Sequence, residues 1–254
     1  MNWSKMLDAK VALVTGGGSG IGRATAQVFA EHGASVMVAD VNGASAEQTV
    51  AGILAAGGDA TFQQTDVGKM QDVERMVQQT VERYGRLDVV LSNAAGYQLG
   101  TATEISEADW DRTLDVCLKA TWMIAHQAMP IMLRQETGAF IITGSVQALR
   151  GYTGHVAYQA AKGGLMALTR SLAADYAPKI RVNAILPGAV ITGIAAHLNE
   201  SQLDHMAKRC PLQRNSRPEE IGRVALFLAS DMSSYVTGTS VIVDGGLTSV
   251  IKMD

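Results

Sequence analysis

Three side chains that could move a proton lie close together in the middle of the sequence: Ser145, Tyr158 and Lys162. The tyrosine and the lysine are four residues apart, so in a helix they lie on the same face. A neighbouring ammonium group favours the phenolate and lowers a pKa that is near ~10 in a free tyrosine. A serine hydroxyl beside them could stabilise a developing alkoxide. The trio predicts proton transfer at an oxygen atom, although a lone tyrosine or lysine here would be typical of an ordinary helix.

A glycine-rich turn at residues 15–22 follows a short apolar run and precedes a helical pattern. Gly16 permits a tight turn, while Gly20 and Gly22 let the backbone approach a phosphate and the next strand. Backbone N–H groups at the start of a helix attract a pyrophosphate, with help from the helix dipole. The spacing GxxxGxG differs from the common fingerprint GxGxxG, so the turn alone also fits a purely structural loop. Together, the turn and the trio predict hydride transfer between a nicotinamide and an alcohol or ketone.

Asp40 closes the second predicted strand, where it would meet the ribose of a bound dinucleotide. A carboxylate there accepts both ribose hydroxyls of NAD and repels a 2′-phosphate. The turn itself supplies no basic partner for such a phosphate, and Arg23 follows the last glycine. The sequence therefore favours NAD over NADP, with an ordinary turn aspartate as the alternative for Asp40.

The composition restricts the class of protein. Hydrophobic residues make up 47% and charged residues 18% of 254, which is typical of a folded domain. A net charge of -3 gives no basis for a nucleic-acid or membrane partner, and the expected partner is a small-molecule substrate. The histidines show no metal-ligand spacing. We expect a cytoplasmic protein without a signal peptide, and Cys117 and Cys210 are interpreted as free thiols.

Strand-like and helix-like runs alternate along the sequence. Apolar runs predict strands at residues 10–14, 35–40, 60–65, 87–92, 139–143, 181–186 and 240–243. Helical spacing predicts helices at residues 21–32, 44–56, 70–84, 106–134 and 158–176. We expect a single doubly wound α/β domain of the Rossmann type over residues 1–254. Its parallel sheet of about seven strands would carry helices on both faces. The polar segment 192–217 follows a strand end and is the expected substrate lid.

Further motifs follow in a fixed order along essentially the whole chain. They are residues 15–22, Asp66-Val67, Asn93-Ala94-Ala95-Gly96, Ser145, Tyr158, Lys162, Arg181-Val182-Asn183, Pro187-Gly188, Thr192 and Asp244-Gly245-Gly246. In this order they resemble the short-chain dehydrogenase/reductase family. The resemblance implies that Tyr158 is the general acid–base, that Ser145 binds the substrate oxygen, and that Lys162 also holds the nicotinamide ribose.

The resemblance also implies a set of coenzyme contacts. Asp66 and Val67 would hold the adenine, Asn93 would lie along the coenzyme, and Ile191 and Thr192 would contact the carboxamide. The full set is Gly16, Ser19, Gly20, Ile21, Gly22, Asp40, Asp66, Val67, Asn93, Ala94, Ala95, Gly96, Tyr158, Lys162, Pro187, Gly188, Ile191 and Thr192. It further implies a homotetramer, with the helices containing Cys117 and Lys162 at one interface. Apolar helix faces would equally fit the core of a monomer.

Two positions depart from the family's pattern. Ala94 stands where a second Asn is common, and Cys117 stands where the family usually places Asn. The resemblance gives that position a part in the proton relay through its backbone carbonyl, which survives the substitution. Cys117 is therefore kept as a catalytic candidate. A redox-sensing NAD-binding protein without turnover is the rival hypothesis, and the intact trio argues against it.

The segment between Ser145 and Tyr158 is expected to line the substrate pocket. The residues that make it polar are Gln147, Arg150, Tyr152 and His155. Arg150 could bind a carboxylate in a bidentate pair or hold the loop together, and His155 could donate to the substrate or lie at a helix start on the surface. The polarity favours a small hydroxylated substrate such as a sugar, sugar acid or hydroxy acid, with a steroid or acyl thioester as the alternative.

Overall fold

The computed structural model describes residues 5–192 and 199–250. Seven parallel strands form a sheet in the order β3-β2-β1-β4-β5-β6-β7. The strands are β1 (Val11–Thr15), β2 (Ser35–Asp40), β3 (Asp59–Gln64), β4 (Val89–Ser92), β5 (Gly138–Thr143), β6 (Ile180–Pro187) and β7 (Ser240–Val243). The order reverses between β1 and β4, which is the type of switch point where ligands bind in such sheets. The predicted Rossmann-type α/β architecture is confirmed.

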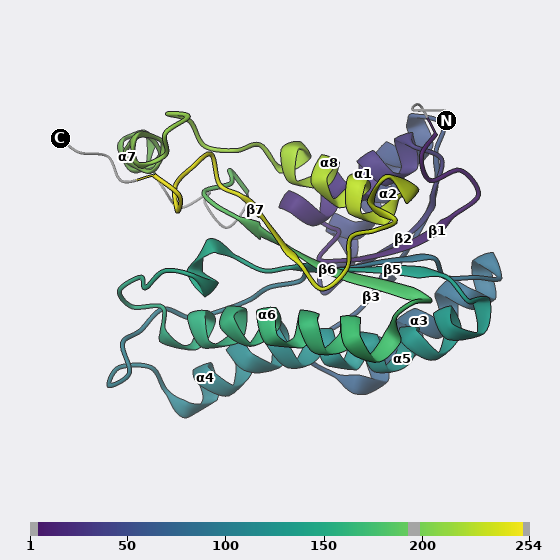
Figure 1. The fold of residues 1–254 in the computed structure, drawn as a ribbon, viewed down its shortest axis with the longest axis horizontal. Helices are drawn as coiled ribbons and strands as arrows, with labels where there is room; N and C mark the ends of the chain where they lie inside the picture. The colour runs from purple at the N-terminus through teal and green to yellow at the C-terminus, as the bar shows by residue number, and fades with distance from the viewer. Residues whose placement is uncertain (1–4, 193–198, 251–254) are drawn as a thin grey trace.

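Helices cover both faces of the sheet, as Figure 1 shows. One layer contains α1 (Gly20–Glu31), α2 (Gly43–Ala55) and α8 (Pro218–Ala229). The other contains α3 (Met70–Tyr84), α4 (Glu107–Leu114), α5 (Ala120–Gln135) and α6 (Val156–Tyr176). Helix α7 (Glu200–Arg209) lies apart from both layers, next to the C-terminal segment. Two short 3₁₀ turns, η2 (Val146–Ala148) and η4 (Asp231–Ser233), complete the elements used below.

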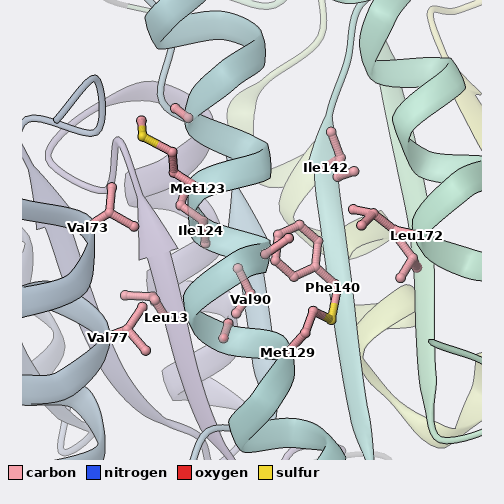
Figure 2. Packing of buried hydrophobic residues seen from close by; sticks show 14 of the residues in the cluster. Leu13, Val73, Val77, Val90, Met123, Ile124, Met129, Phe140, Ile142 and Leu172 are labelled. Carbon is pink, nitrogen blue, oxygen red and sulfur yellow. The ribbon is translucent and has the colours of Figure 1, made fainter. Parts of the chain in front are cut away.

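Each face of the sheet has its own apolar core because side chains alternate along a strand. In β1, Leu13 belongs to the cluster under α3, α5 and α6, whereas Ala12 and Val14 belong to the cluster under α1 and α8. Figure 2 shows Phe140 and Val90 of the first cluster packed against α5. Burial on both faces explains why the strands read as continuous apolar runs.

The structure differs from the predicted elements at several points. The helix predicted at residues 106–134 is divided, because the π-helical turn η1 (Asp115–Lys119) lies between α4 and α5. Strand β6 continues through Pro187, beyond the predicted end at residue 186. Helices α7 and α8 were not predicted, although Pro218 in the first turn of α8 and its buried Ile221 and Leu226 are helix signals. Part of the predicted lid, residues 193–198, lies outside the described residues.

None of the described helices is long and apolar enough to cross a membrane. Among residues 5–192 and 199–250, no group of three or more His, Cys, Asp or Glu side chains could hold a metal ion.

Candidate active site

The predicted site residues gather at one edge of the sheet. The glycine turn follows β1, Asp40 ends β2, and Asn93 follows β4. Ser145 follows β5, and Pro187 ends β6. Because all strands are parallel, their carboxyl ends meet at the same edge, so residues far apart in sequence come together. By contrast, a hollow of 510 Å³ lies near the starts of β2 and β3, lined by Ser35 and Asp59 among others, at the opposite edge.

The glycine turn is shaped by positive backbone angles and close contacts. Gly16 and Gly20 have φ of 64° and 51°, a region that L side chains rarely adopt. A Cβ atom on Gly22 would lie 2.0 Å from the carbonyl oxygen of Gly16, so only glycine fits there. A Cβ atom on Gly20 would approach the Thr192 side chain to 3.1 Å. The chain after β6 therefore passes directly beside the turn, and the predicted contact of Thr192 with the carboxamide stays a prediction.

The start of α1 suits an anionic group. Its N-cap residue Ser19 makes no side-chain cap, and the first turn holds no acidic residue. The first N–H groups of a helix have no partner within it, and they carry the positive end of the helix dipole. The residues present therefore fit the pyrophosphate of a dinucleotide.

Asp40 is held by main-chain donors from two segments. Its Oδ2 accepts from the Gly18 N–H at 2.9 Å, and its Oδ1 accepts from the Asn42 N–H at 2.9 Å. Arg23 lies nearby but donates to the Gly18 carbonyl and, through Nε at 3.2 Å, to the Thr49 hydroxyl. The Arg23 guanidinium thus stabilises the turn through contacts within it.

The loop after β4 is joined to the glycine turn. The Thr15 hydroxyl accepts from the N–H groups of Asn93 at 2.9 Å and Ala94 at 3.2 Å. The Asn93 side-chain amide donates to the Thr15 carbonyl at 3.0 Å. Ala95 and Gly96 follow on the exposed side of this loop. These bonds hold the floor of the site between β1 and β4.

Asp66 and Val67 follow β3, the edge strand on the same side of the sheet as β2. Val67 is buried, whereas the Asp66 carboxylate accepts from the Gly68 N–H at 3.0 Å and from Arg112 of α4 at 3.1 Å. Burial alone would raise the pKa of Asp66, but Gly68 and Arg112 outweigh it and hold the pKa below its usual value. Asp66 is therefore ionised at neutral pH, and part of its acceptor capacity is engaged by Arg112.

Lys162 is the most constrained member of the trio. Its side chain is 2% exposed, and its Nζ donates to the Thr143 carbonyl at 2.7 Å. The same Nζ lies 5.4 Å from the centre of the Tyr158 ring, one turn earlier on α6. Ser145 caps η2 by accepting from the Gln147 N–H at 3.1 Å. The structure thus brings Ser145, Tyr158 and Lys162 together.

The pKa of the phenol differs from the expectation. Burial raises the pKa of Tyr158 well above its ordinary value, the Cys117 thiol adds to the rise, and the Ser145 hydroxyl opposes it. Burial also lowers the pKa of Lys162, against the influence of Cys117. The protein's own residues therefore do not by themselves produce the expected fall in the Tyr158 pKa, because desolvation penalises the charged form of each group.

Cys117 lies in the π-helical turn η1 and is 2% exposed. Its Sγ donates to the Gly96 carbonyl at 3.4 Å, so the thiol ties η1 to the loop after β4. Its electrostatic influence on Tyr158 and Lys162 places it beside the trio. The side chain that replaces the family's usual Asn therefore makes a specific contact of its own.

Tyr97 is a neighbour of the trio that the sequence did not reveal. Its ring centre lies 4.4 Å from that of Tyr158 with the planes tilted by 40°, and 6.2 Å from that of His155. Burial raises the pKa of the Tyr97 phenol, with contributions from Tyr158 and Cys117. The signal in the sequence is only that Tyr97 directly follows Gly96.

The polar residues predicted to line the pocket differ in their burial and in their partners. Gln147 is partly buried, and no described residue hydrogen-bonds its buried Oε1. His155 lies before α6, where its Nδ1 is 2.8 Å from the Thr153 carbonyl. Arg150 is exposed and donates to the Thr248 carbonyl, so it ties this loop to the C-terminal segment. Its contact fits a structural arginine, with the chain's C-terminal segment as the partner.

The described part of the predicted lid lies over this loop. Ile191 is 48% exposed, and its N–H donates to the Ser216 carbonyl at 3.0 Å. From the end of α7, the Arg209 guanidinium lies 5.9 Å from the centre of the Tyr152 ring. At the same edge of the sheet, the N–H of Gly188, which follows β6, donates at 3.0 Å to the carbonyl of Val243 at the end of β7. The contacts of Ser216 and Arg209 place the described part of residues 192–217 near the strand ends and the loop that contains Tyr152, and its role as a lid stays a prediction.

Comparisons with known proteins agree with this geometry. A family model described as enoyl-(acyl carrier protein) reductase matches residues 16–248. The 3-oxoacyl-[acyl-carrier-protein] reductase FabG of Thermotoga maritima is 36% identical over 242 residues, covering 95% of this chain and 98% of the relative. The chain belongs to the short-chain dehydrogenase/reductase family.

Other members of the family are similar over nearly their full length. Cyclohexanol dehydrogenase of Acinetobacter sp. is 37% identical over 248 residues, which cover 97% of this chain and 98% of the relative. The crystal structure of levodione reductase superposes with a TM-score of 0.92 at 32% identity, covering 96% of this chain and 100% of that one. As a short-chain dehydrogenase/reductase, the protein is an oxidoreductase, and the family uses nicotinamide coenzymes.

Proposed function

We propose that this protein is an NAD-dependent dehydrogenase/reductase that interconverts a secondary alcohol and a ketone. The observation that carries the proposal is the cluster of Ser145, Tyr158 and Lys162 at the same edge of the sheet as the glycine turn, with Lys162 fixed by the Thr143 carbonyl. A protein that only sensed NAD would have no need for a proton donor held against a buried lysine.

Each residue of the cluster has a distinct task in the proposal. On oxidation, the alcohol loses the proton of its hydroxyl to Tyr158 and a hydride from its carbinol carbon. NAD⁺, when bound, would supply the acceptor for that hydride. Ser145 hydrogen-bonds the substrate oxygen and stabilises its negative charge. Lys162 favours the phenolate that accepts the proton, against the burial that disfavours it.

The preference for NAD rests on Asp40. Its carboxylate is fixed by Gly18 and Asn42 at the end of β2, where the ribose would lie. Arg23, the nearby cation, contacts Gly18 and Thr49, so its guanidinium is engaged within the turn. A fixed anion with no opposing cation aimed outward supports NAD over NADP.

The substrate is proposed to be small and to carry hydroxyl groups, such as a sugar, sugar acid or hydroxy acid. The buried Oε1 of Gln147 supports this class, because an unpaired acceptor gains a hydrogen bond from a substrate hydroxyl. The hypothesis that Arg150 binds a substrate carboxylate gains no support, since its guanidinium donates to the Thr248 carbonyl.

The test is a panel of secondary alcohols assayed with NAD and with NADP, followed by NADH or NADPH absorbance. Polyols, hydroxy acids, cyclic alcohols and 3-hydroxyacyl thioesters form the arms of the panel. NADH formation at least about tenfold faster than NADPH formation is expected, since one charge-assisted contact is worth roughly that factor. If no alcohol is oxidised and no matching ketone is reduced, the proposed activity is wrong.

A homotetramer is also proposed. Trp122 on α5 is 46% exposed, and Ile242 is 43% exposed on β7, an edge strand of the sheet. Exposed apolar side chains on a helix and on a sheet edge fit two separate subunit contacts. Light scattering measured over a range of protein concentrations tests this assembly.

A further inference from the structure

Tyr97 forms a wall beside the group that transfers the proton. Its ring lies 4.4 Å from the Tyr158 ring, centre to centre, and both rings are partly exposed. His155 continues the wall at 6.2 Å from Tyr97, and Tyr152 lies 6.1 Å from His155. A molecule that brings its oxygen to the Tyr158 hydroxyl therefore meets a row of rings.

The wall is fixed at both ends of its loop. Gly96 is held by the Cys117 thiol, and the Gly100 N–H donates to the Gly154 carbonyl at 2.8 Å. Gly100 also pairs with His155 in an isolated bridge. Tyr97 is thereby placed against the start of α6 by contacts on each side of it.

The fold itself does not require this aromatic side chain. Tyr97 belongs to neither of the two apolar cores, and none of the described residues hydrogen-bonds its hydroxyl. Its ring contacts within the described chain are Tyr158 and His155. A large ring that serves neither core and flanks the proton donor is placed to contact substrate.

A flat aromatic face discriminates between shapes of substrate. A compact saturated ring lays several C–H groups against such a face at once, and it has few torsions to lose on binding. An open chain of the same size touches the face with fewer atoms in any one conformation and loses rotational freedom when it is ordered.

We propose that Tyr97 is a specificity-determining residue that selects substrates whose carbinol carbon belongs to a ring. This inference rests on the proposed function and names the substrate class of the same site. A ring-shaped polyol would fit both features of the site. Its C–H face would lie against Tyr97, and a hydroxyl at its edge would donate to the Gln147 Oε1.

The experiment compares cyclohexanol with 2-hexanol, two secondary alcohols with six carbon atoms, as NAD-linked substrates of the wild type and of Tyr97→Leu and Tyr97→Phe. The measured quantity is the ratio of the two kcat/KM values. The wild type should favour the ring. Tyr97→Leu should lower the ratio by about three- to tenfold, through the KM of cyclohexanol, and Tyr97→Phe should keep it within about twofold.

Tyr235→Leu is the matched control, because Tyr235 is fully exposed at 102% and lies outside the site. This variant should leave the ratio unchanged, and the KM for NAD should be unchanged in all four proteins. Thermal unfolding of each variant checks that it is folded, and Tyr97→Trp provides a second aromatic side chain if the leucine variant is unstable. In that case, Tyr97→Trp should retain the ring preference and Tyr97→Ala should lose it. These two results would support the inference equally.

The two proposals fail differently. If the wild type oxidises both alcohols without favouring the ring, or if folded Tyr97→Leu keeps the wild-type ratio, the inference about Tyr97 is overturned while the proposed function stands. If no alcohol in the wider panel is oxidised and no ketone is reduced, the proposed function is wrong, and the inference about Tyr97, which rests on it, is wrong as well.

Discussion

The coenzyme side of the site is shaped by main chain, whereas the substrate side is shaped by side chains that reach between loops. On the first side, Gly16 and Gly20 adopt positive φ, and Asp40 is held by two backbone N–H groups. On the second side, Tyr97 packs on Tyr158, and Arg209 lies over Tyr152. Main-chain geometry serves a ligand shared by many enzymes, and exchangeable side chains serve a ligand that differs among them.

The largest effect is expected where the two sides meet, at the phenol. Tyr158→Phe removes the proton donor and keeps the ring, so kcat should fall by about 10²–10⁴-fold. The glycine turn is untouched, so NADH should bind with unchanged affinity in a fluorescence titration. A variant that retains turnover within about tenfold of the wild type would exclude Tyr158 as the acid–base.

The pH dependence should differ between the two directions of the reaction. Burial raises the pKa of Tyr158, so the phenol is protonated at neutral pH and is ready to donate in ketone reduction. Oxidation needs the phenolate, and its kcat/KM should rise by about tenfold per pH unit, or about a hundredfold over two units, below that pKa. Reduction should be flat in this range and fall at higher pH. Parallel pH profiles for both directions would contradict the assignment.

A smaller effect is expected from Asp40, the charge proposed to select the coenzyme. Asp40→Ser removes the carboxylate, so the ratio of kcat/KM for NAD to that for NADP should fall by about ten- to a hundredfold. Asp59→Ser is the control, since Asp59 is a carboxylate at the opposite end of the neighbouring strand β3 and accepts from the Ser35 hydroxyl. An equal change in both variants would show a general charge effect and remove the special role of Asp40.

The smallest effect is expected from the thiol that connects η1 with the loop before Tyr97. Cys117→Ala loses the hydrogen bond to the Gly96 carbonyl and should lower kcat/KM by about two- to fivefold. Cys117→Ser keeps a donor and should retain most of the activity. Equal activity in the wild type and the alanine variant would show that the catalytic group does not depend on this contact.

The elements with strong periodicity were predicted well from the sequence. Strand β2 and helix α3 have the predicted bounds of 35–40 and 70–84, because each carries an uninterrupted pattern between clear end signals. Helix α8 was missed although Pro218 begins it, since it follows a polar segment of irregular pattern. Where the parallel strands end, the gathering of Asp40, Asn93 and Ser145 followed from the topology alone.

Other features of the site depend on contacts that no spacing reveals. Tyr97 and Tyr158 are 61 residues apart in sequence, and their stacking results from the way two loops are joined at Gly100 and Gly154. The pKa of Tyr158 is set by a competition between desolvation and neighbouring groups, and the sequence identifies the neighbours without the extent of burial. The hydrogen bond from Arg150 to the Thr248 carbonyl likewise joins two segments that are far apart in the sequence, so no spacing predicts it.

The π-helical turn at residues 115–119 suggests that the fold would accept the deletion of one residue between α4 and α5. Such a turn holds one more residue than the regular helix that would replace it. Deleting one residue there would leave Met123, Ile124 and Met129 directed into the core, because α4 and α5 would join in the register they already have. The shortened protein should fold, yet it would present a different atom to Gly96, so the additional residue affects the contact with the loop after β4 more than the core.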